Sequence, residues 1–304
     1  MSEPLVSVLV PAYNHERFVR SALDSVLVDN YPRLELIILD DGSLDGTLAV
    51  AQTWATQNAS RLERLEVHTQ PNQGVCKTAN RLISEARGEY IAFLASDDEL
   101  VPGGIECRVN ALQKHPEWLA VFGDAEMIDG DGHLLCQSAL VEEFKADKSA
   151  LLDSKTRCLE LLLHWCVPGP VFMARREAFD PDQGVGPYDE GFVFEDRDYY
   201  ARLLSRRALG FIDAVVARYR VHGRNMCRGE AEHYGMSEQF LLMEIRNRSR
   251  FRGLEGMAVA MNIANLRSRR PGATRFHKIR GSLSRRFMRW LRQWNSARVG
   301  PKES

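Results

Sequence analysis

The sequence lacks several features that would place it in a common class of protein. No stretch of its 304 residues reaches the roughly 18 consecutive apolar residues that a membrane-spanning helix needs. Residues 1–4 (MSEP) lack the basic and apolar start of a secretion signal. None of the six cysteines forms a C-x-x-C pair, so no zinc or redox motif is visible, and scattered thiols suit a reducing compartment. We therefore expect a cytoplasmic protein.

Two nucleotide-binding signatures are also missing after the first apolar run, residues 5–10. The segment that follows it, residues 11–15 (PAYNH), contains no G-x-G-x-x-G, which argues against a dinucleotide-dependent oxidoreductase. It also lacks the glycine-rich loop and basic residue of a sugar nucleotidyltransferase. Sugar nucleotidyltransferases share the α/β architecture, however, and this class of enzyme stays an alternative function for the chain.

Charge is distributed unevenly along the chain, although the net charge is only −1. From Arg267 to the end there are twelve Lys and Arg residues against Glu303 alone, which gives 12 − 1 = +11. The remainder carries 28 basic and 40 acidic residues, or −12. The basic tail therefore needs a partner or a solvated surface of its own.

Apolar runs and helical patterns alternate through the first hundred residues. Short buried-strand patterns at residues 5–10, 34–39, 65–69 and 90–94 are separated by segments with helical spacing. This alternation predicts an α/β fold, a mostly parallel central sheet with helices on both faces. A hairpin is expected around residues 129–132, and a last amphipathic helix from residue 282 to about 297.

Three polar clusters directly follow predicted strands and should meet at one edge of the sheet. They are residues 13–14, 40–41 and 97–98. Adjacent carboxylates at 97–98 suit a hard cation such as Mg²⁺ or Mn²⁺, although a solvated turn is the alternative. A carboxylate at 40–41 could accept a base ring N–H or form an Asx turn, and Tyr13 could stack on a base or sit in a turn.

The ordered set of motifs resembles the GT-A glycosyltransferases of family 2. The set comprises P-A-Y-N at 11–14, D-D-G-S-L-D-G-T at 40–47, N-Q-G at 72–74 and G-E-Y-I-A-F-L-A-S-D-D at 88–98. The resemblance implies an inverting transferase that uses a UDP- or dTDP-sugar of hexosyl or deoxyhexosyl type. It also implies a glycan or lipid-linked acceptor, in bacterial-type surface polysaccharide synthesis. A degenerate domain that only binds nucleotide or membrane is the non-enzymatic alternative.

On the donor side, the resemblance implies that Pro11, Tyr13 and Asp41 frame the nucleobase, with Asp40 beside them. Asp98 matches the carboxylate that binds a Mn²⁺ or Mg²⁺ ion bridging the diphosphate. Asp97 matches a contact to ribose or to a basic group.

Further donor contacts are weaker matches. Lys77 could supply positive charge near the diphosphate, because the usual Arg before Asn80 is replaced by Ala79. His222, in Y-R-V-H-G-R-N at 219–225, would lie near the diphosphate or metal. A structural surface histidine is its alternative.

The acidic segment F-E-D-R-D-Y at 194–199 resembles the family's acidic loop that opens a helix. It implies that Asp196 is the catalytic base, with Glu195 and Asp198 as alternatives, since helix N-termini attract acids in any case. We expect a GT-A domain at 1–225, divided into a nucleotide-binding half (1–115) and an acceptor half (116–225). A helical basic extension follows at 226–304.

The last predicted helix combines an apolar face with arginines. The apolar face carries Leu283, Phe287, Trp290, Leu291 and Trp294, and Arg285, Arg286, Arg289 and Arg292 flank it. This composition favours an anionic membrane surface, and peripheral association with the inner face of the cytoplasmic membrane. The alternative is a helix packed on its own domain. No nucleic-acid-binding motif accompanies the charge, so nucleic acid is not expected as a partner.

Overall fold

The computed structural model describes residues 3–193, 196–223, 225, 236–270 and 274–299. Contacts divide the chain into two units, each described below by itself. The sheet unit comprises Met1–Glu143, Val167–Glu195 and Ala208–His222, and the helical unit comprises Phe144–Cys166, Asp196–Arg207 and Gly223–Ser304. The helical unit thus includes two earlier segments besides the C-terminal part, and the predicted domain boundary after residue 225 stays a prediction.

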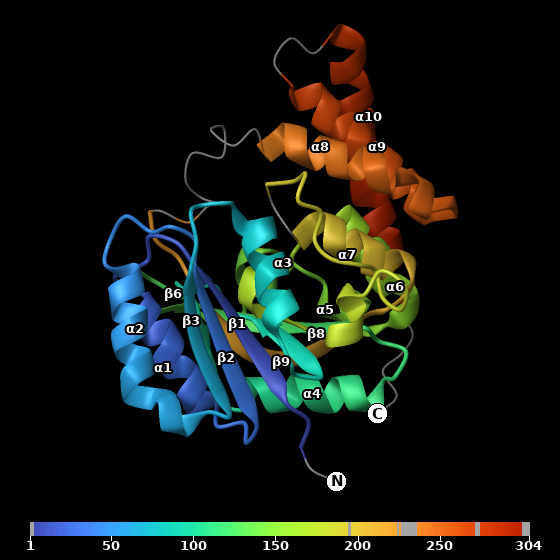
Figure 1. The fold of residues 1–304 in the computed structure, drawn as a ribbon. Coiled ribbons are helices and arrows are strands. Elements are labelled where there is room, and N and C mark those ends of the chain that lie inside the picture. Colours follow the sequence, from blue (N-terminus) through green and yellow to red (C-terminus); the bar gives the residue numbers. More distant parts are fainter. Residues whose placement is uncertain (1–2, 194–195, 224, 226–235, 271–273, 300–304) are drawn as a thin grey trace. The chain divides into compact units, whose positions relative to one another are not determined.

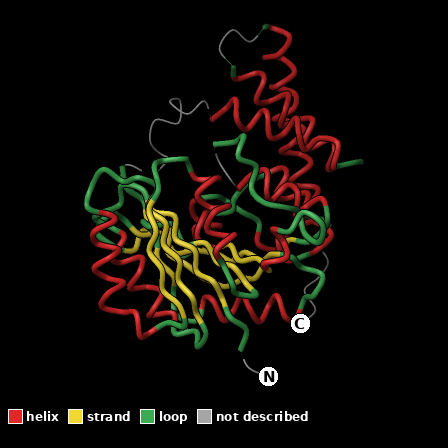
Figure 2. The backbone as a smooth tube through the Cα atoms, viewed as in Figure 1, coloured by secondary structure: helices red, strands yellow, loops and turns green. Residues whose placement is uncertain are grey.

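The first half of the sheet unit is a parallel sheet (Figures 1 and 2). Its strands are β1 (Val6–Ala12), β2 (Leu34–Asp40), β3 (Arg64–Thr69) and β4 (Tyr90–Phe93). They lie in the order β3-β2-β1-β4, and each neighbouring pair is parallel. β1 and β2 are almost completely buried, which explains their near-continuous apolar sequences.

The second half adds antiparallel pairs to the same sheet. Its strands are β5 (Glu99–Leu100), β6 (Ala120–Ile128), β7 (Leu134–Cys136), β8 (Phe172–Arg175) and β9 (Leu209–Arg220). β8 runs antiparallel between β4 and β6, whereas β6 and β9 are parallel. β6 and β7 form the predicted hairpin. β5 pairs antiparallel with β9 directly after the acidic residues 97–98.

Helices cover both faces of this sheet, as predicted. They are α1 (Val19–Asp29), α2 (Thr47–Asn58), α3 (Val75–Glu85) and α4 (Gly104–Lys114). α1, α2 and α4 share one apolar core with the inward side chains of β1, β2 and β4, such as Val8, Leu36 and Ala92. α3 packs against β1 and β2. The short helical turns are η1 (Ala59–Arg61), η2 (Ala139–Glu143), η3 (Gly169–Val171), η4 (Arg176–Phe179) and η5 (Arg248–Arg250).

The helical unit is built from six α-helices in the described residues. They are α5 (Lys148–Leu152), α6 (Ser154–Leu163), α7 (Asp196–Ser205), α8 (Met236–Asn247), α9 (Gly253–Arg269) and α10 (Arg275–Ser296). α9 packs against α6, α8 and α10. α10 begins earlier than the sequence suggested, because the side chain of Thr274 caps its first turn. No described helix combines the length and apolarity needed to cross a membrane.

A buried carboxylate connects the amino-terminal ends of the parallel strands. Glu35 in β2 is 1% exposed, accepts hydrogen bonds from the Ser7 hydroxyl and from Arg87 N (2.5 Å), and pairs with Arg64 Nη1 at 3.0 Å. Gly88 N also donates to it, and a Cβ at Gly88 would lie 2.6 Å from the backbone N of Ser7. This close approach explains the glycine that opens the G-E-Y-I-A-F-L segment.

We expect Glu35→Gln to lower the free energy of unfolding by about 1–3 kcal/mol at neutral pH, because charge-assisted hydrogen bonds are lost inside the protein. Burial raises the pKa of Glu35, but the hydrogen bonds from Ser7, Arg87, Arg64 and Gly88 outweigh it and hold the pKa below its usual value. The stabilisation is therefore present above the unfolded-state pKa and is lost as pH falls through the lower folded-state pKa.

Urea unfolding at neutral and acidic pH measures both effects. Glu63→Gln is the matched control, because Glu63 pairs with Arg33 at the surface and should cost at most about 1 kcal/mol. Equal losses in the two variants, or a Glu35→Gln difference that persists at low pH, would contradict the assignment.

Candidate functional site

The loops that follow β1 and β2 are locked together at the carboxyl edge of the sheet. Asn14, in the left-handed region at φ 54°, donates its backbone N–H to Ser43 Oγ (2.9 Å) and accepts Leu44 N on Oδ1 (2.8 Å). His15 N donates to Thr47 Oγ1 at 2.8 Å. Tyr13 projects from this clamp with 44% of its surface exposed. An exposed aromatic ring on a fixed loop can receive a flat ligand.

The two carboxylates at the end of β2 are buried and have different partners. Asp41 accepts Gln70 Nε2 (2.7 Å) and Gln73 N (2.9 Å) on Oδ1, and Gly74 N (2.9 Å) on Oδ2. It thereby positions the turn that begins α3. Asp40 Oδ2 accepts Ser43 N at 3.1 Å, while its buried Oδ1 has no hydrogen-bond partner among the described residues.

The remaining residues predicted for this side of the site are Lys77 in the first turn of α3 and Pro11 in β1. Lys77 is exposed, and Pro11 at the end of β1 is partly exposed. Asn80 exchanges two hydrogen bonds of 2.9 Å with the backbone of Tyr188, which fixes the loop of residues 187–190 onto α3. Asn80 is therefore a structural anchor within the described contacts.

Arg220 organises the acidic run that follows β4. This residue of β9 is 3% exposed, and its Nε donates to the backbone O of Asp97 (2.8 Å). Its backbone N donates to Asp98 Oδ1 (2.8 Å), and its guanidinium pairs with the carboxylate of Glu99. No role for Arg220 was predicted from the sequence. Its place in the Y-R-V-H segment, two residues before His222, was the available signal.

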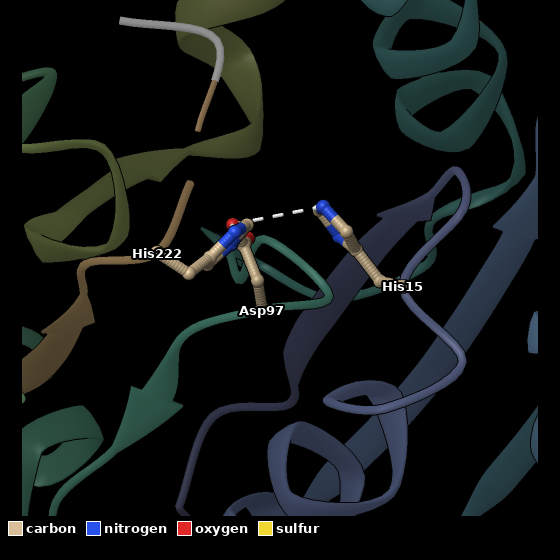
Figure 3. Close-up of side chains that lie close together, drawn as sticks. All are labelled: His15, Asp97 and His222. Atoms are coloured by element: carbon tan, nitrogen blue, oxygen red, sulfur yellow. Dashed lines mark hydrogen bonds and ion pairs between the residues drawn. The ribbon is translucent and has the colours of Figure 1, made fainter. Parts of the chain in front are cut away.

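Two histidines flank Asp97 (Figure 3). His222 Nε2 lies 2.9 Å from Asp97 Oδ2, and His15 Nε2 lies 3.7 Å from the same oxygen. The other ring nitrogen of His15 lies 2.8 Å from Ser96 Oγ, and the ring of Phe18 stacks on His222 at 4.5 Å. One ligand atom from each of His15, Asp97 and His222 lies within 4.8 Å of the others. The sequence predicted His222 but missed His15, whose only signal is its position after P-A-Y-N.

The two adjacent carboxyls are held in different electrostatic environments. Burial raises the pKa of Asp97, but the hydrogen bond from His222 and the charges of His15 and His222 outweigh it, so its pKa is lowered. Burial, together with the charge of Asp97, raises the pKa of Asp98 well above its usual value. The histidine partners therefore favour Asp97 as the ionised carboxylate, whereas the assignment of a metal to Asp98 stays a prediction.

Asp196, the predicted base, is the first residue of α7 in the helical unit. Its Oδ1 accepts the backbone N of Arg197 at 2.5 Å. Although the residue is partly exposed, its carboxyl is surrounded by protein atoms, and this burial raises its pKa. Asp198, one alternative, is bound to Asn247 Nδ2 (2.7 Å) and Arg202 Nε (2.9 Å). Glu195, the other alternative, lies outside the described residues.

Two curated relatives are similar to this chain over part of their length. An uncharacterised glycosyltransferase of Rickettsia typhi is 28% identical over 224 residues, which covers 72% of this chain and 64% of the relative. The chondroitin synthase of Pasteurella multocida is 32% identical over 145 residues, 48% of this chain and 15% of that protein. The chain therefore spans less than two thirds of the length of both relatives.

Two solved structures have a similar fold. Staphylococcus aureus TarS in complex with UDP-GlcNAc gives a TM-score of 0.63 at 15% identity, covering 95% of this chain and 92% of that one. A mannosyltransferase of Pyrobaculum calidifontis in complex with GDP-Man and Mn²⁺ gives 0.63 at 15% identity, covering 97% and 85%. The fold predicted from the sequence, GT-A with a C-terminal helical extension, is thereby confirmed.

The sequence profile described as Glycosyl transferase family 2 matches residues 7–180, more than half of the chain, over the elements that carry Tyr13, Asp41 and Asp97. The chain therefore belongs to glycosyl transferase family 2.

Proposed function

We propose that this glycosyltransferase moves a sugar from a UDP- or dTDP-sugar to a hydroxyl of a glycan or lipid-linked acceptor, with inversion at the anomeric carbon. The observation that carries the proposal is the carboxylate of Asp97 held between His15 and His222, at the same sheet edge as Tyr13 and Asp41. The complexes of TarS with UDP-GlcNAc and of the mannosyltransferase with GDP-Man support a nucleotide-sugar donor. The similarity to chondroitin synthase supports an acceptor in polysaccharide synthesis.

The nucleobase would lie against the exposed ring of Tyr13, beside Pro11. Asp41 Oδ2 accepts one hydrogen bond from the backbone and, as a carboxylate oxygen, has capacity for a second. A uracil or thymine ring N–H is a suitable donor to it. Asp40 would contribute by holding the turn after β2, because its Oδ2 accepts a hydrogen bond from Ser43 N.

The residues around Asp97 fit a divalent cation. They supply one carboxylate and two imidazoles, and the hydrogen bond between His15 and Ser96 orients the His15 ring as is usual for a metal ligand. Two nitrogen ligands favour Mn²⁺ over Mg²⁺, which prefers oxygen. Such an ion would neutralise charge on the departing diphosphate. Asp98 would not bind the ion itself but would help to position Asp97, because it accepts a hydrogen bond from Arg220 N. The exposed Lys77 would add positive charge near the phosphates.

We expect Asp97→Asn to weaken Mn²⁺-dependent UDP binding at least roughly tenfold, because even a residue that only orients a metal ligand contributes about 10–100-fold. Asp98→Asn should have a smaller effect, since Asp98 is bound to Arg220 N. Titration calorimetry with and without Mn²⁺ measures both. Asp131→Asn is the control, because Asp131 lies exposed on the turn after β6.

The opposite order, with Asp98→Asn abolishing binding and Asp97→Asn leaving it intact, would restore the sequence-based assignment of the metal to Asp98. Unchanged binding in both variants would refute a metal at this acidic pair.

Asp196 is proposed as the base that takes the proton from the acceptor hydroxyl. A carboxyl whose pKa is raised by burial is a stronger base than an ordinary one, provided it remains ionised at the working pH. Its competitor Asp198 is occupied by Asn247 and Arg202, which gives it a structural explanation. These contacts support Asp196 over Asp198 for the chemical step.

We expect Asp196→Asn to bind UDP normally and to lose about 10²–10⁴-fold in transfer rate, the usual contribution of a general base. The wild-type rate should fall as pH drops through the raised pKa of Asp196, and the variant should lack this acidic limb. Release of UDP from a panel of UDP- and dTDP-sugars provides the assay. Asp198→Asn should instead lower thermal stability, and near-normal turnover by Asp196→Asn would remove the assignment.

The exposed stripe of α10 supports association with an anionic membrane. Ile279, Leu283, Trp290 and Trp294 are 54%, 60%, 54% and 37% exposed and share one side of the helix. Leu291 differs from the sequence-based expectation: it is 1% exposed and packs inside the helical unit. Arg280 and Arg286 are exposed beside the stripe. Indole rings beside arginines are typical of helices that lie in a lipid interface.

We expect the double variant Trp290→Ala, Trp294→Ala to weaken binding to phosphatidylserine vesicles at least roughly tenfold, since two aromatic side chains lose burial in the interface. Leu242→Ala, on the exposed side of α8, is the control. We substitute the two indoles and leave the helix in place, because α10 also buries Leu291 and Asn295. Equal vesicle binding by wild type and variant, measured by co-sedimentation, would exclude the stripe as a membrane contact.

A further inference from the structure

The helical unit contains a cavity of about 370 Å³ formed by the end of α6 together with α9 and α10. Its polar lining consists of His164, Asn265, Arg269, Arg285, Arg289 and Arg292, which we call the arginine pocket. Residues 285, 289 and 292 recur at helical spacing and so share one side of α10. Residues 265 and 269 likewise lie one turn apart on α9. The volume falls within the range of roughly 300–1,000 Å³ of small-molecule sites.

Only one of the four arginines is neutralised by a carboxylate in the described part of the chain. Arg292 Nε pairs with Glu160, which is fully buried, at 2.7 Å. Arg285 Nη1 instead donates to neutral oxygens, Asn265 Oδ1 at 2.9 Å and Ser268 Oγ at 3.2 Å. No ion pair among the described residues involves Arg269 or Arg289, which are exposed at the rim of the pocket. Three arginines thus line one cavity without a carboxylate partner among the described residues.

We propose that the arginine pocket binds a phosphate or diphosphate group. Three neighbouring cations repel one another, and an anion bound between them would relieve this repulsion. A phosphate ester or diphosphate carries about two or more negative charges at neutral pH. Guanidinium forks bind phosphate oxygens through two parallel hydrogen bonds, and several forks can act on one group. A single carboxylate offers only one charge and two oxygens.

The arginine pocket is independent of the membrane stripe and of the proposed metal. At about 100° per residue, positions 285, 289 and 292 lie on the opposite side of α10 from 283, 290 and 294. The lining contains no carboxylate, so binding of an anion there needs no divalent cation. The two properties separate this site experimentally from the proposed donor site.

Titration calorimetry of the full-length protein with inorganic pyrophosphate, in metal-free buffer, tests the proposal. We expect saturable binding by wild type, and a loss of about tenfold or more in affinity for the double variant Arg269→Gln, Arg289→Gln, since each charge-assisted hydrogen bond contributes substantially to affinity. Both side chains are exposed, so the fold should be retained. Arg286→Gln removes an exposed arginine of α10 outside the pocket and should bind as wild type. Absence of binding to wild type, or equal affinity in all three proteins, would overturn the proposal.

Two further arms identify the source of the phosphate and keep the sites apart. If pyrophosphate displaces the protein from phosphatidic acid vesicles, and the Arg269→Gln, Arg289→Gln variant is not displaced, the natural group is a lipid headgroup; binding without displacement assigns a soluble phosphate compound. Asp97→Asn should retain metal-free pyrophosphate binding. Its loss in that variant would place the bound pyrophosphate at the donor site and overturn the pocket, whatever the fate of the glycosyltransferase mechanism.

Discussion

The buried guanidinium of Arg220 is the contact on which the sheet-edge site depends. Three consecutive acids after β4 could not be buried without a compensating cation, because desolvation and mutual repulsion both disfavour their charged forms. Arg220 binds the backbone of Asp97 and the carboxylate of Glu99, reaches Asp129 O at 3.2 Å, and lies 5.3 Å from the centre of the Phe18 ring. One side chain from β9 thereby ties together segments more than a hundred residues apart in the sequence.

This arrangement also determines which way Asp97 faces. With Asp98 accepting Arg220 N, its neighbour Asp97 is directed toward the imidazoles of His15 and His222. Phe18 stacks on His222 and contacts the guanidinium of Arg220. The segment after β1 is thereby packed against the end of β9. The two adjacent residues are of the same type, but their surroundings in the site differ. Its asymmetry comes from the strand that supplies Arg220 and His222.

The fold was largely predictable because its first half is local. Each of β1, β2 and β3 is followed directly by a helix or helical turn, and short apolar runs mark β1 and β2 in the sequence. The insertion of the antiparallel strand β8 between β4 and β6, by contrast, depends on long-range pairing that a four-residue segment cannot encode. His15 escaped notice for the same reason: its partners Asp97 and Ser96 lie about eighty residues away.

The basic tail shows how far net charge alone can be interpreted. Its arginines stand in physically different environments along a single helix: Arg292 compensates the buried Glu160, Arg285 bonds to neutral oxygens, and Arg286 is exposed to solvent. A charge of +11 counted from the sequence therefore does not act as one uniform patch. Packing assigns part of it to stability and part to the rim of a cavity. An arginine that already pairs with a carboxylate is less available to bind an anionic ligand. Which arginines are paired depends on the side of the helix on which each of them lies.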